Sequence, residues 1–206
     1  MLQRWLCAVL LNLALLPGFA YANAENPANS ILILGDSISA AYGINPEQGW
    51  VTLLSKELAK ELEVVNASVS GETTSGALAR LPALLKEYQP DFLLIELGGN
   101  DGLRGYPIQS IRKNLQSLIT QGQNAGAKII LLGMKIPPNY GKRYTDGFAD
   151  NYDQLSSQNG VLLIPFFLED IATQNSLMQQ DGIHPNAKAQ PLIVQKLMPQ
   201  LKALLN

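Results

Sequence analysis

The sequence predicts an α/β protein, a three-layer α/β/α sandwich around a five-stranded parallel sheet. Two observations predict this fold. Short runs of consecutive apolar residues recur along the chain, and amphipathic stretches separate them. Parallel strands that are buried on both faces have continuous apolar runs, and helices provide the connections between them. With no internal repeat or linker-like segment, we expect residues 25–206 to form a single domain.

The five expected strands are four to six residues long and apolar at nearly every position. They cover residues 31–34, 64–67, 92–97, 129–132 and 161–164. Such runs are typical of strands with neighbours on both faces.

Helices are expected between these strands, where apolar residues recur every three or four positions. The expected ranges are 50–62, 75–88, 108–124, 144–157 and 186–204. Pro107 opens the third range, where proline is tolerated, and Gly126 ends it. Pro191 either kinks the last helix or marks its true start.

The N-terminus has the pattern of a secretory signal peptide. Arg4 precedes an apolar stretch over residues 5–16 that is short for a membrane span, and small residues follow it. Cleavage after Ala22 or Ala24 fits the small-residue rule, and we favour Ala24. We therefore expect a periplasmic or secreted protein, with an uncleaved membrane anchor as the alternative.

Composition limits the partners of the mature chain. The net charge of the whole sequence is −2 and no run of Lys or Arg occurs, which argues against nucleic-acid binding. No second apolar segment is long enough to cross a membrane, so we expect no stable insertion after cleavage. Cys7, the only cysteine, lies in the signal segment. We expect a monomer. Its domain is large enough to bury a hydrophobic core that is stable without disulfides.

The polar residues that could take part in catalysis or binding follow the expected strands. Ser37 follows the first strand, Gly71 the second and Asn100 the third, while Asp181 and His184 come after the fifth. The carboxyl ends of parallel strands meet at one edge of a sheet, where ligands bind. We therefore expect these residues to gather at that edge.

His184 is the only histidine and the only candidate for an imidazole base. A serine needs such a base to remove its proton, and Ser37 stands in a Gly-Asp-Ser turn. Asp181, three residues before His184, could orient the ring. The chain order Ser, Asp, His fits a catalytic triad. Alternatively, Asp181 caps a turn and His184 only packs against the last helix.

Three groups are candidates for stabilising a developing oxyanion. They are the backbone N–H of Ser37, the backbone of Gly71, where the missing Cβ permits close approach, and the side chain of Asn100 in Gly98-Gly99-Asn100-Asp101. The alternative for each group is ordinary turn chemistry.

Gly35-Asp36-Ser37, Gly71, Gly98-Gly99-Asn100-Asp101 and Asp181-x-x-His184 together resemble, in order, the four sequence blocks of the SGNH or GDSL-like hydrolases. The chain most resembles a group of periplasmic bacterial enzymes with thioesterase, protease, lysophospholipase and arylesterase activity. The resemblance implies a flavodoxin-like α/β/α sandwich, a triad of Ser37, His184 and Asp181, and an oxyanion hole of Ser37, Gly71 and Asn100. It also implies that no metal or organic cofactor is needed.

Substrate contacts are expected from the loop 135–144 and from apolar residues near the expected site. We nominate Tyr42, Leu103, Pro138 and Tyr140, with the basic end of the loop near a phosphate head group. The predicted substrates are acyl esters and thioesters, including aryl esters and lysophospholipids.

Other classes of protein remain as alternatives. A carbohydrate acetylesterase would use the same machinery, and a non-catalytic lipid- or sugar-binding protein would need none of it intact. The first turn lacks the glycine pattern and lysine of nucleotide-binding loops. One histidine with carboxylates alone is too sparse for a typical zinc site.

Overall fold

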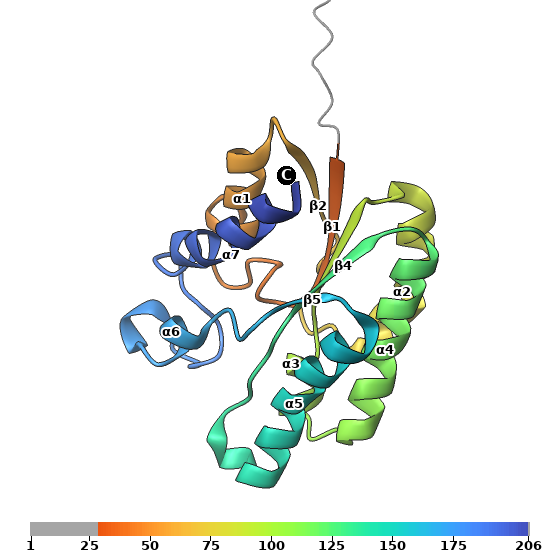
Figure 1. Ribbon diagram of the computed structural model, residues 1–206. Helices are drawn as coiled ribbons and strands as arrows, with labels where there is room; N and C mark the ends of the chain where they lie inside the picture. Colours follow the sequence, from red (N-terminus) through yellow and green to blue (C-terminus); the bar gives the residue numbers. More distant parts are fainter. Residues whose placement is uncertain (1–28, 206) are drawn as a thin grey trace, which may run out of the picture.

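Five parallel strands form the central layer of the molecule (Figure 1). The computed structural model describes residues 29–205, so the expected signal peptide and its cleavage positions lie outside it. The strands are β1 (Asn29–Gly35), β2 (Leu62–Asn66), β3 (Phe92–Glu96), β4 (Lys128–Leu132) and β5 (Leu162–Ile164). The prediction of a five-stranded parallel sheet is confirmed.

The strand order is β2-β1-β3-β4-β5, and it determines where along the edge of the sheet a ligand can bind. From β1 the chain passes to β2 on one side and then returns to β3 on the other side of β1. Ile31 pairs with Val64 of β2 and with Phe92 of β3. Connections that leave neighbouring strands in opposite directions open a crevice beyond their carboxyl ends. Residues that follow β1 and β3 therefore lie at this crevice.

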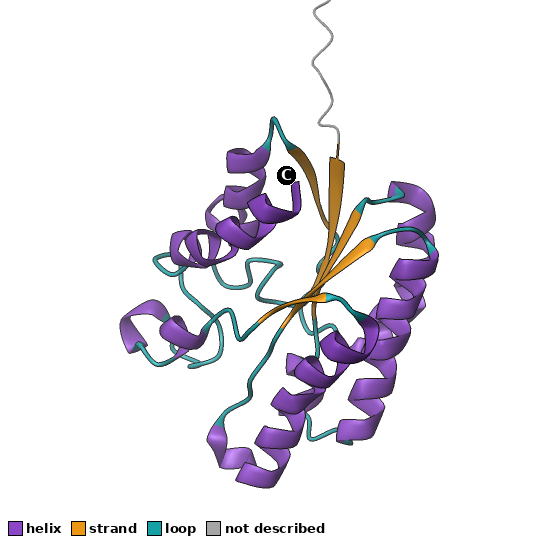
Figure 2. Cartoon of the chain, viewed as in Figure 1, coloured by secondary structure: helices purple, strands orange, loops and turns teal. Residues whose placement is uncertain are grey.

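Helices cover both faces of the sheet, which completes the predicted three-layer sandwich (Figure 2). On one side, α1 (Trp50–Leu58) packs with α7 (Gln190–Leu205). On the other, α4 (Ile108–Asn124) packs between α2 (Thr74–Tyr88) and α5 (Lys142–Asn159). The shorter helices are α3 (Gly99–Leu103), α6 (Glu169–Ala172) and the 3-10 turns η1 (Pro46–Gln48), η2 (Pro138–Tyr140) and η3 (Asn175–Leu177).

Several expected helix boundaries differ from the structure for identifiable reasons. The helix expected over 50–62 ends at Leu58, and Leu62 belongs to β2, where it pairs with Asn29. Leu62 happened to continue the helical spacing, although it is buried by the sheet. At the other end of the chain, Pro191 lies in the first turn of α7, so it marks the start of the helix.

The expectation for the fourth helix was too short at both ends. α5 begins directly after Gly141, which has a φ of 87°, and ends at Asn159, directly before Gly160, whose φ of 61° is left-handed. Such glycines commonly end helices. The amide of Gly160 donates to the carbonyl of Ser156, which satisfies a terminal carbonyl.

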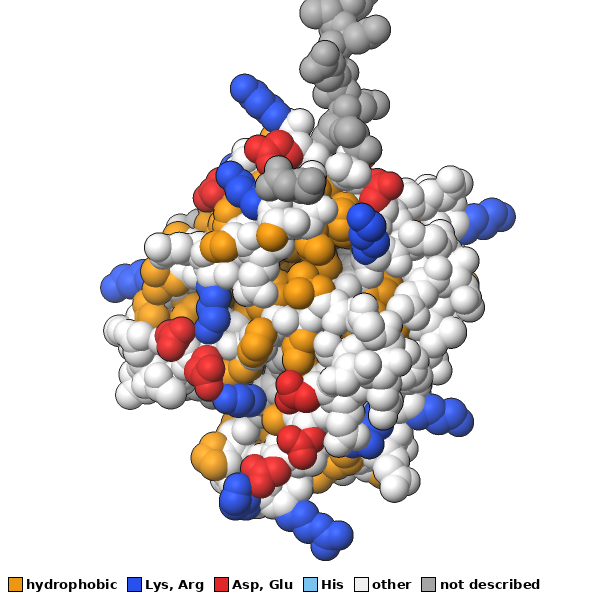
Figure 3. Space-filling view, in the orientation of Figure 1, with side chains coloured by type: hydrophobic (Ala, Val, Ile, Leu, Met, Phe, Trp, Pro, Cys, Tyr) orange, Lys and Arg blue, Asp and Glu red, His pale blue; other side chains and the backbone are white. Residues whose placement is uncertain are grey.

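The core lies on both faces of β1 and β3, whose central residues are buried. Tyr152 also lies in this core, and its hydroxyl donates to the carbonyl of Leu97 at 2.8 Å. On the face shown in Figure 3, acidic and basic side chains are interspersed. No helix within residues 29–205 has the length and apolar character needed to cross a membrane.

Candidate active site

The turn that carries Ser37 is packed tightly against the end of β3. A Cβ at Gly35 would lie 2.6 Å from Ser39 Oγ and 2.8 Å from Glu96 Oε2, so only glycine fits. Glu96 Oε2 accepts hydrogen bonds from the Asp36 N–H at 3.1 Å and the Ser39 hydroxyl at 2.7 Å. These contacts fix the turn in which Ser37, only 9% exposed, follows β1.

Asp181 and His184 belong to a compact loop before α7. Asp181 Oδ1 accepts the backbone N–H groups of Ile183 at 2.9 Å and His184 at 3.0 Å. Gly182 has a φ of 67°, a conformation that glycine adopts without strain. The loop is closed by a hydrogen bond of 2.8 Å from the Gln179 N–H to the His184 carbonyl.

The structure brings Ser37, His184 and Asp181 into one hydrogen-bonded row, although Ser37 and His184 are 147 positions apart. Ser37 Oγ lies 2.8 Å from His184 Nε2, and Asp181 Oδ2 lies 2.6 Å from His184 Nδ1. Both distances are within hydrogen-bond range. The arrangement can pass a proton from the serine to the imidazole while the carboxylate orients the ring.

The contacts of Asp181 favour its ionised form. Partial burial opposes ionisation, but the backbone and ring hydrogen bonds with His184, the Ile183 N–H and the charge of His184 together lower the pKa of Asp181 to about 2. An ionised Asp181 can only accept hydrogen bonds, so it favours the imidazole tautomer with its proton on Nδ1. That tautomer leaves Nε2 free to accept the serine proton.

Gln179 and Tyr42 link the serine turn to the histidine loop. The Gln179 amide donates to the Tyr42 carbonyl at 2.7 Å and to the Pro185 carbonyl at 3.2 Å. The Tyr42 ring lies on the imidazole of His184, with 4.7 Å between the ring centres. Tyr42, expected to contact substrate, thus contacts the candidate base and remains 53% exposed.

Asn100 enters the site from the start of α3. Gly98, with a φ of 111°, turns the chain sharply after β3, and a Cβ there would collide with the Tyr152 hydroxyl. The Asn100 Nδ2 donates to Asp36 Oδ2 at 3.1 Å. Asn100 and Ser37 line the same cavity.

Gly71 lies in a loop that is tied to the α3 segment. Its carbonyl accepts a hydrogen bond from Arg104 Nη2 at 3.2 Å, and its φ is 79°. Thr74, at the start of α2, donates to the buried Asp101 carboxylate from its backbone N–H at 2.9 Å and its hydroxyl at 2.6 Å. These bonds hold the Gly71 loop beside the residues that follow Asn100, although Gly71 does not line the cavity that holds Ser37.

Two buried carboxyl groups lie behind the serine. Burial raises the pKa of Asp36 to about 6, while the Ile38 N–H, the charge of His184 and Asn100 lower it. Burial and then the charge of Asp36 raise the pKa of Glu96 well above its usual range. We infer that Asp36 carries the negative charge of this pair at neutral pH.

A cavity of about 520 Å³ opens beside the Ser37 hydroxyl. Leu103 and Pro138, both expected to contact substrate, line it together with His184. Most of the other lining side chains are apolar and come from the segments after β4 and β5: Met134, Ile136, Pro137, Phe166, Leu168, Ala172, Met178 and Ile183. An apolar cavity next to a hydroxyl group can hold the apolar part of a ligand.

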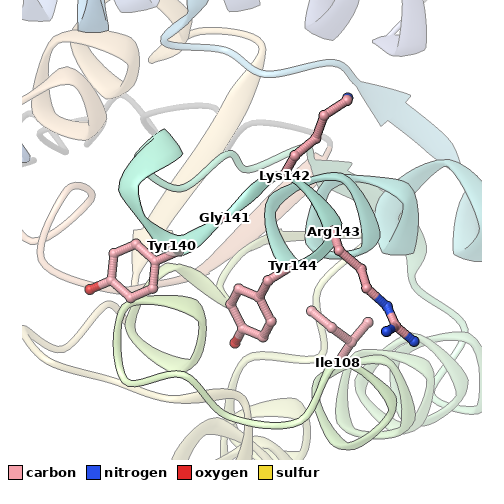
Figure 4. Close-up of a pocket in the computed structure, with 6 residues that line it drawn as sticks. All are labelled: Ile108, Tyr140, Gly141, Lys142, Arg143 and Tyr144. Carbon is pink, nitrogen blue, oxygen red and sulfur yellow. The ribbon is translucent and has the colours of Figure 1, made fainter.

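Tyr140 does not lie where we expected it. It lines a separate open pocket of about 430 Å³ together with Ile108, Gly141, Lys142, Arg143 and Tyr144 (Figure 4). Its hydroxyl donates to the Leu103 carbonyl at 2.7 Å, so Tyr140 supports a cavity residue from behind. Lys142, which pairs with Asp146, points away from the two tyrosine rings. The η2 turn separates Pro138 and Tyr140 into different pockets.

Sequence reasoning missed two parts of the site. The first is the pair Asp36 and Glu96, although both lie at the carboxyl ends of neighbouring strands. The second is the wall from Phe166 to Met178, which lacks the periodicity of a long element. The rule that sites lie beyond strand ends would have indicated both parts.

Known proteins resemble this chain over most of its length. Residues 33–191 match the GDSL-like Lipase/Acylhydrolase family. The chain is 50% identical over 181 residues to a Pseudomonas aeruginosa protein named Esterase TesA, covering 86% of this chain and 90% of the relative. It is 44% identical over 179 residues to the Escherichia coli protein named Thioesterase 1/protease 1/lysophospholipase L1, covering 87% of this chain and 86% of the relative.

A solved structure agrees with the fold as well. The crystal structure of a psychrotrophic esterase, EstA from a Pseudoalteromonas species, inhibited by monoethylphosphonate, matches with a TM-score of 0.83. The two sequences are 48% identical, and the match covers 86% of this chain and 99% of that chain.

Proposed function

This chain belongs to the GDSL-like lipase/acylhydrolase family and is a carboxylic ester hydrolase, and we propose that Ser37 is its nucleophile. The observation that carries the proposal is the row formed by Ser37, His184 and Asp181, with distances of 2.8 Å and 2.6 Å. A serine that only caps a turn has no need of an oriented imidazole at hydrogen-bond distance.

The proposed reaction has two stages. The Ser37 oxygen attacks the ester carbonyl while its proton moves to His184 Nε2, and Asp181 stabilises the resulting imidazolium. The tetrahedral intermediate then expels the alcohol or thiol, which takes the proton from His184 and leaves an acyl group on Ser37. In the second stage, water gives a proton to His184, attacks the acyl-enzyme and releases the carboxylic acid, and Ser37 regains its proton.

The oxyanion is the point at which negative charge develops, and we assign its stabilisation to Ser37 N–H, Gly71 N–H and the Asn100 amide. Asn100 is supported by its place in the Ser37 cavity. For Gly71, support comes from the bonds that tie its loop to the α3 segment. Each such donor acts mainly on the transition state, so its loss lowers kcat more than it changes KM.

The proposed substrates are esters and thioesters of medium or long acyl chains, among them aryl esters and lysophospholipids. Support comes from the apolar walls of the cavity and from the names of the relatives, which include esterase, thioesterase and lysophospholipase. A carbohydrate acetylesterase is disfavoured because a sugar would find few polar partners on these walls. We further propose that residues 1–24 direct export to the periplasm or medium and are then removed, leaving a monomeric domain of residues 25–206.

The test combines one variant with a substrate series. Ser37→Ala should abolish hydrolysis of p-nitrophenyl esters and leave the melting temperature close to that of the wild type, since the small side chain makes few packing contacts. Ser75→Ala, at an exposed serine of α2, is the control and should keep full activity.

In the wild type, kcat/KM for p-nitrophenyl esters should increase from acetyl to medium acyl chains. The kcat/KM for medium-chain esters should also exceed the kcat/KM for deacetylation of acetylated xylan. Preference for the polysaccharide would instead support the acetylesterase. Residual turnover by Ser37→Ala would refute the assignment of the nucleophile.

A further inference from the structure

Asp36, next to the proposed nucleophile, has a side chain that the proposed reaction does not use. We propose that Asp36 is a positioning residue that fixes which end of the Asn100 amide faces the substrate. The inference rests on the proposed function, because it assumes that the Asn100 amide donates to the oxyanion.

Both oxygens of the Asp36 carboxyl group have defined partners. Oδ1 accepts the Ile38 N–H at 3.0 Å, and Oδ2 accepts the Asn100 Nδ2 at 3.1 Å. The residue is 2% exposed, so water has little access to compete for these bonds. The backbone of Asp36 is itself held by its N–H donating to Glu96 Oε2. The carboxyl group therefore presents one fixed oxygen to Asn100.

The chemistry of the two groups makes their contact directional. A primary amide has a nitrogen end with two N–H donors and an oxygen end that only accepts, and the two ends have almost the same shape. An ionised carboxylate accepts only. Because Asp36, whose pKa is about 6, is largely ionised at neutral pH, it accepts the nitrogen end of Asn100 and repels the oxygen end. One N–H then bonds to Asp36, and the other N–H remains for the substrate oxyanion.

The substitution Asp36→Asn should reverse this direction with almost no change in shape. The new side chain can still accept the Ile38 N–H through its oxygen, which turns its own amide nitrogen toward Asn100. That nitrogen can only donate. Asn100 must then rotate its oxygen toward residue 36, and its nitrogen leaves the position from which it donates to the oxyanion.

The experiment is a double-mutant cycle of Asp36→Asn and Asn100→Ala, measured as kcat and KM on a short aryl ester at neutral pH. Each single variant should lower kcat by roughly 10²–10³-fold, the usual effect of losing an oxyanion donor, with KM nearly unchanged. The double variant should be no slower than the slower single variant, because both changes remove the same donor. Asp91→Asn is the control: this carboxylate bonds Ser30 at the other end of β1 and should be neutral for kcat.

The outcomes separate the two proposals. If Asn100→Ala keeps full kcat, the proposed oxyanion role of Asn100 fails. If Asn100→Ala loses kcat but Asp36→Asn does not, only the positioning role is overturned. Effects that multiply in the double variant would also overturn it, since Asp36 would then act independently of Asn100.

A purely structural role of the contact is distinguished by the melting temperature of Asp36→Asn. Because the rotated Asn100 oxygen can accept from the new amide, a hydrogen bond between the two side chains persists, so the melting temperature should stay close to that of the wild type while kcat falls. A loss of kcat that only follows a loss of folded protein would show that the contact serves stability alone and would overturn the positioning role.

A measurement on the wild-type protein requires no variant to fold. In ¹⁵N–¹H spectra, one Asn100 side-chain proton should be shifted downfield by the carboxylate and should exchange with water more slowly than the other. Two protons that both exchange rapidly, at the shifts of a solvent-exposed side-chain amide, would overturn the proposal.

Discussion

At the scale of single residues, each polar atom of the His184 ring has one partner. Nε2 lies 2.8 Å from the Ser37 hydroxyl, and Nδ1 lies 2.6 Å from Asp181. The ring is partly buried, with 17% of its side chain exposed, while Asp181 is 38% exposed. Asp181 therefore acts through the direction of its hydrogen bonds more than through a buried charge.

Asp181→Asn should isolate that directional effect. The oxygen of the new amide can still accept the backbone N–H groups of Ile183 and His184, so the loop should persist. The amide nitrogen, however, donates toward Nδ1 and favours the tautomer that cannot accept the Ser37 proton. We expect kcat to fall by roughly 10³–10⁴-fold with little change in melting temperature. Steady-state kinetics and thermal unfolding test this, and near-normal kcat would contradict the role of Asp181.

The pH dependence of kcat/KM should reflect Asp36 as well as His184. His184 must be neutral to accept a proton. Asp36 must be ionised so that its carboxylate can only accept hydrogen bonds and holds the nitrogen end of Asn100. Because burial raises the pKa of Asp36 to about 6, its ionised form is lost as the pH falls through that value. Wild-type kcat/KM should therefore fall on the acid side more steeply than one protonation allows.

The control for this profile is Asn100→Ala, in which Asp36 has no amide to orient. Its acid limb should follow a single protonation. An acid limb of one protonation in the wild type, identical to that of Asn100→Ala, would show that Asp36 does not affect the reaction.

At the scale of elements, the site depends on how α2 and α3 are joined. The α3 helix has only five residues, too few for a helix that is stable by itself. It is anchored because the Asp101 carboxylate, 1% exposed, accepts two hydrogen bonds from Thr74 at the start of α2. Asn114 of α4 donates to the Thr74 hydroxyl at 3.0 Å, which extends the network to a third helix.

Thr74→Val should show how much the hydrogen bonds of the Thr74 hydroxyl contribute to the free energy of unfolding. The substitution preserves the shape of the side chain but removes the hydroxyl that donates to Asp101 and accepts from Asn114. Hydrogen bonds to buried charged groups contribute about 1.5–3 kcal/mol, so the free energy of unfolding should fall by about that amount. Denaturant unfolding measures it, with Thr120→Val at an exposed position of α4 as the control. Equal stabilities of the two variants would contradict the anchoring role.

At the scale of the whole molecule, sheet topology explains why distant residues meet. Ser37 follows β1 and Asn100 follows β3, the neighbouring strands from which the chain leaves in opposite directions. Apolar runs predicted all five strands, of which β1, β3 and β4 are buried along most of their length and the edge strands β2 and β5 only in part. The meeting of Ser37 and His184 was predictable for a related reason, since both residues follow strands at the same edge of the sheet.

Other features were not predictable because they depend on side-chain directions or irregular backbone. The bond between Asp36 and Asn100 requires knowing which way two turns face. Phe166 and Met178 reach the cavity from a segment with only short helical turns, which has no period to recognise. Tyr140 was misplaced because a single 3-10 turn directs it to a different pocket from Pro138.

The central claim is that Ser37 is a nucleophile activated by His184, and covalent labelling with a phosphonate ester tests it most directly. The reagent should inactivate the enzyme with one equivalent bound, and peptide mass spectrometry should locate the adduct on Ser37. Asp181→Asn should be labelled much more slowly, because its imidazole is held in the wrong tautomer. An adduct on another serine, or full labelling of the Ser37→Ala variant, would contradict the account.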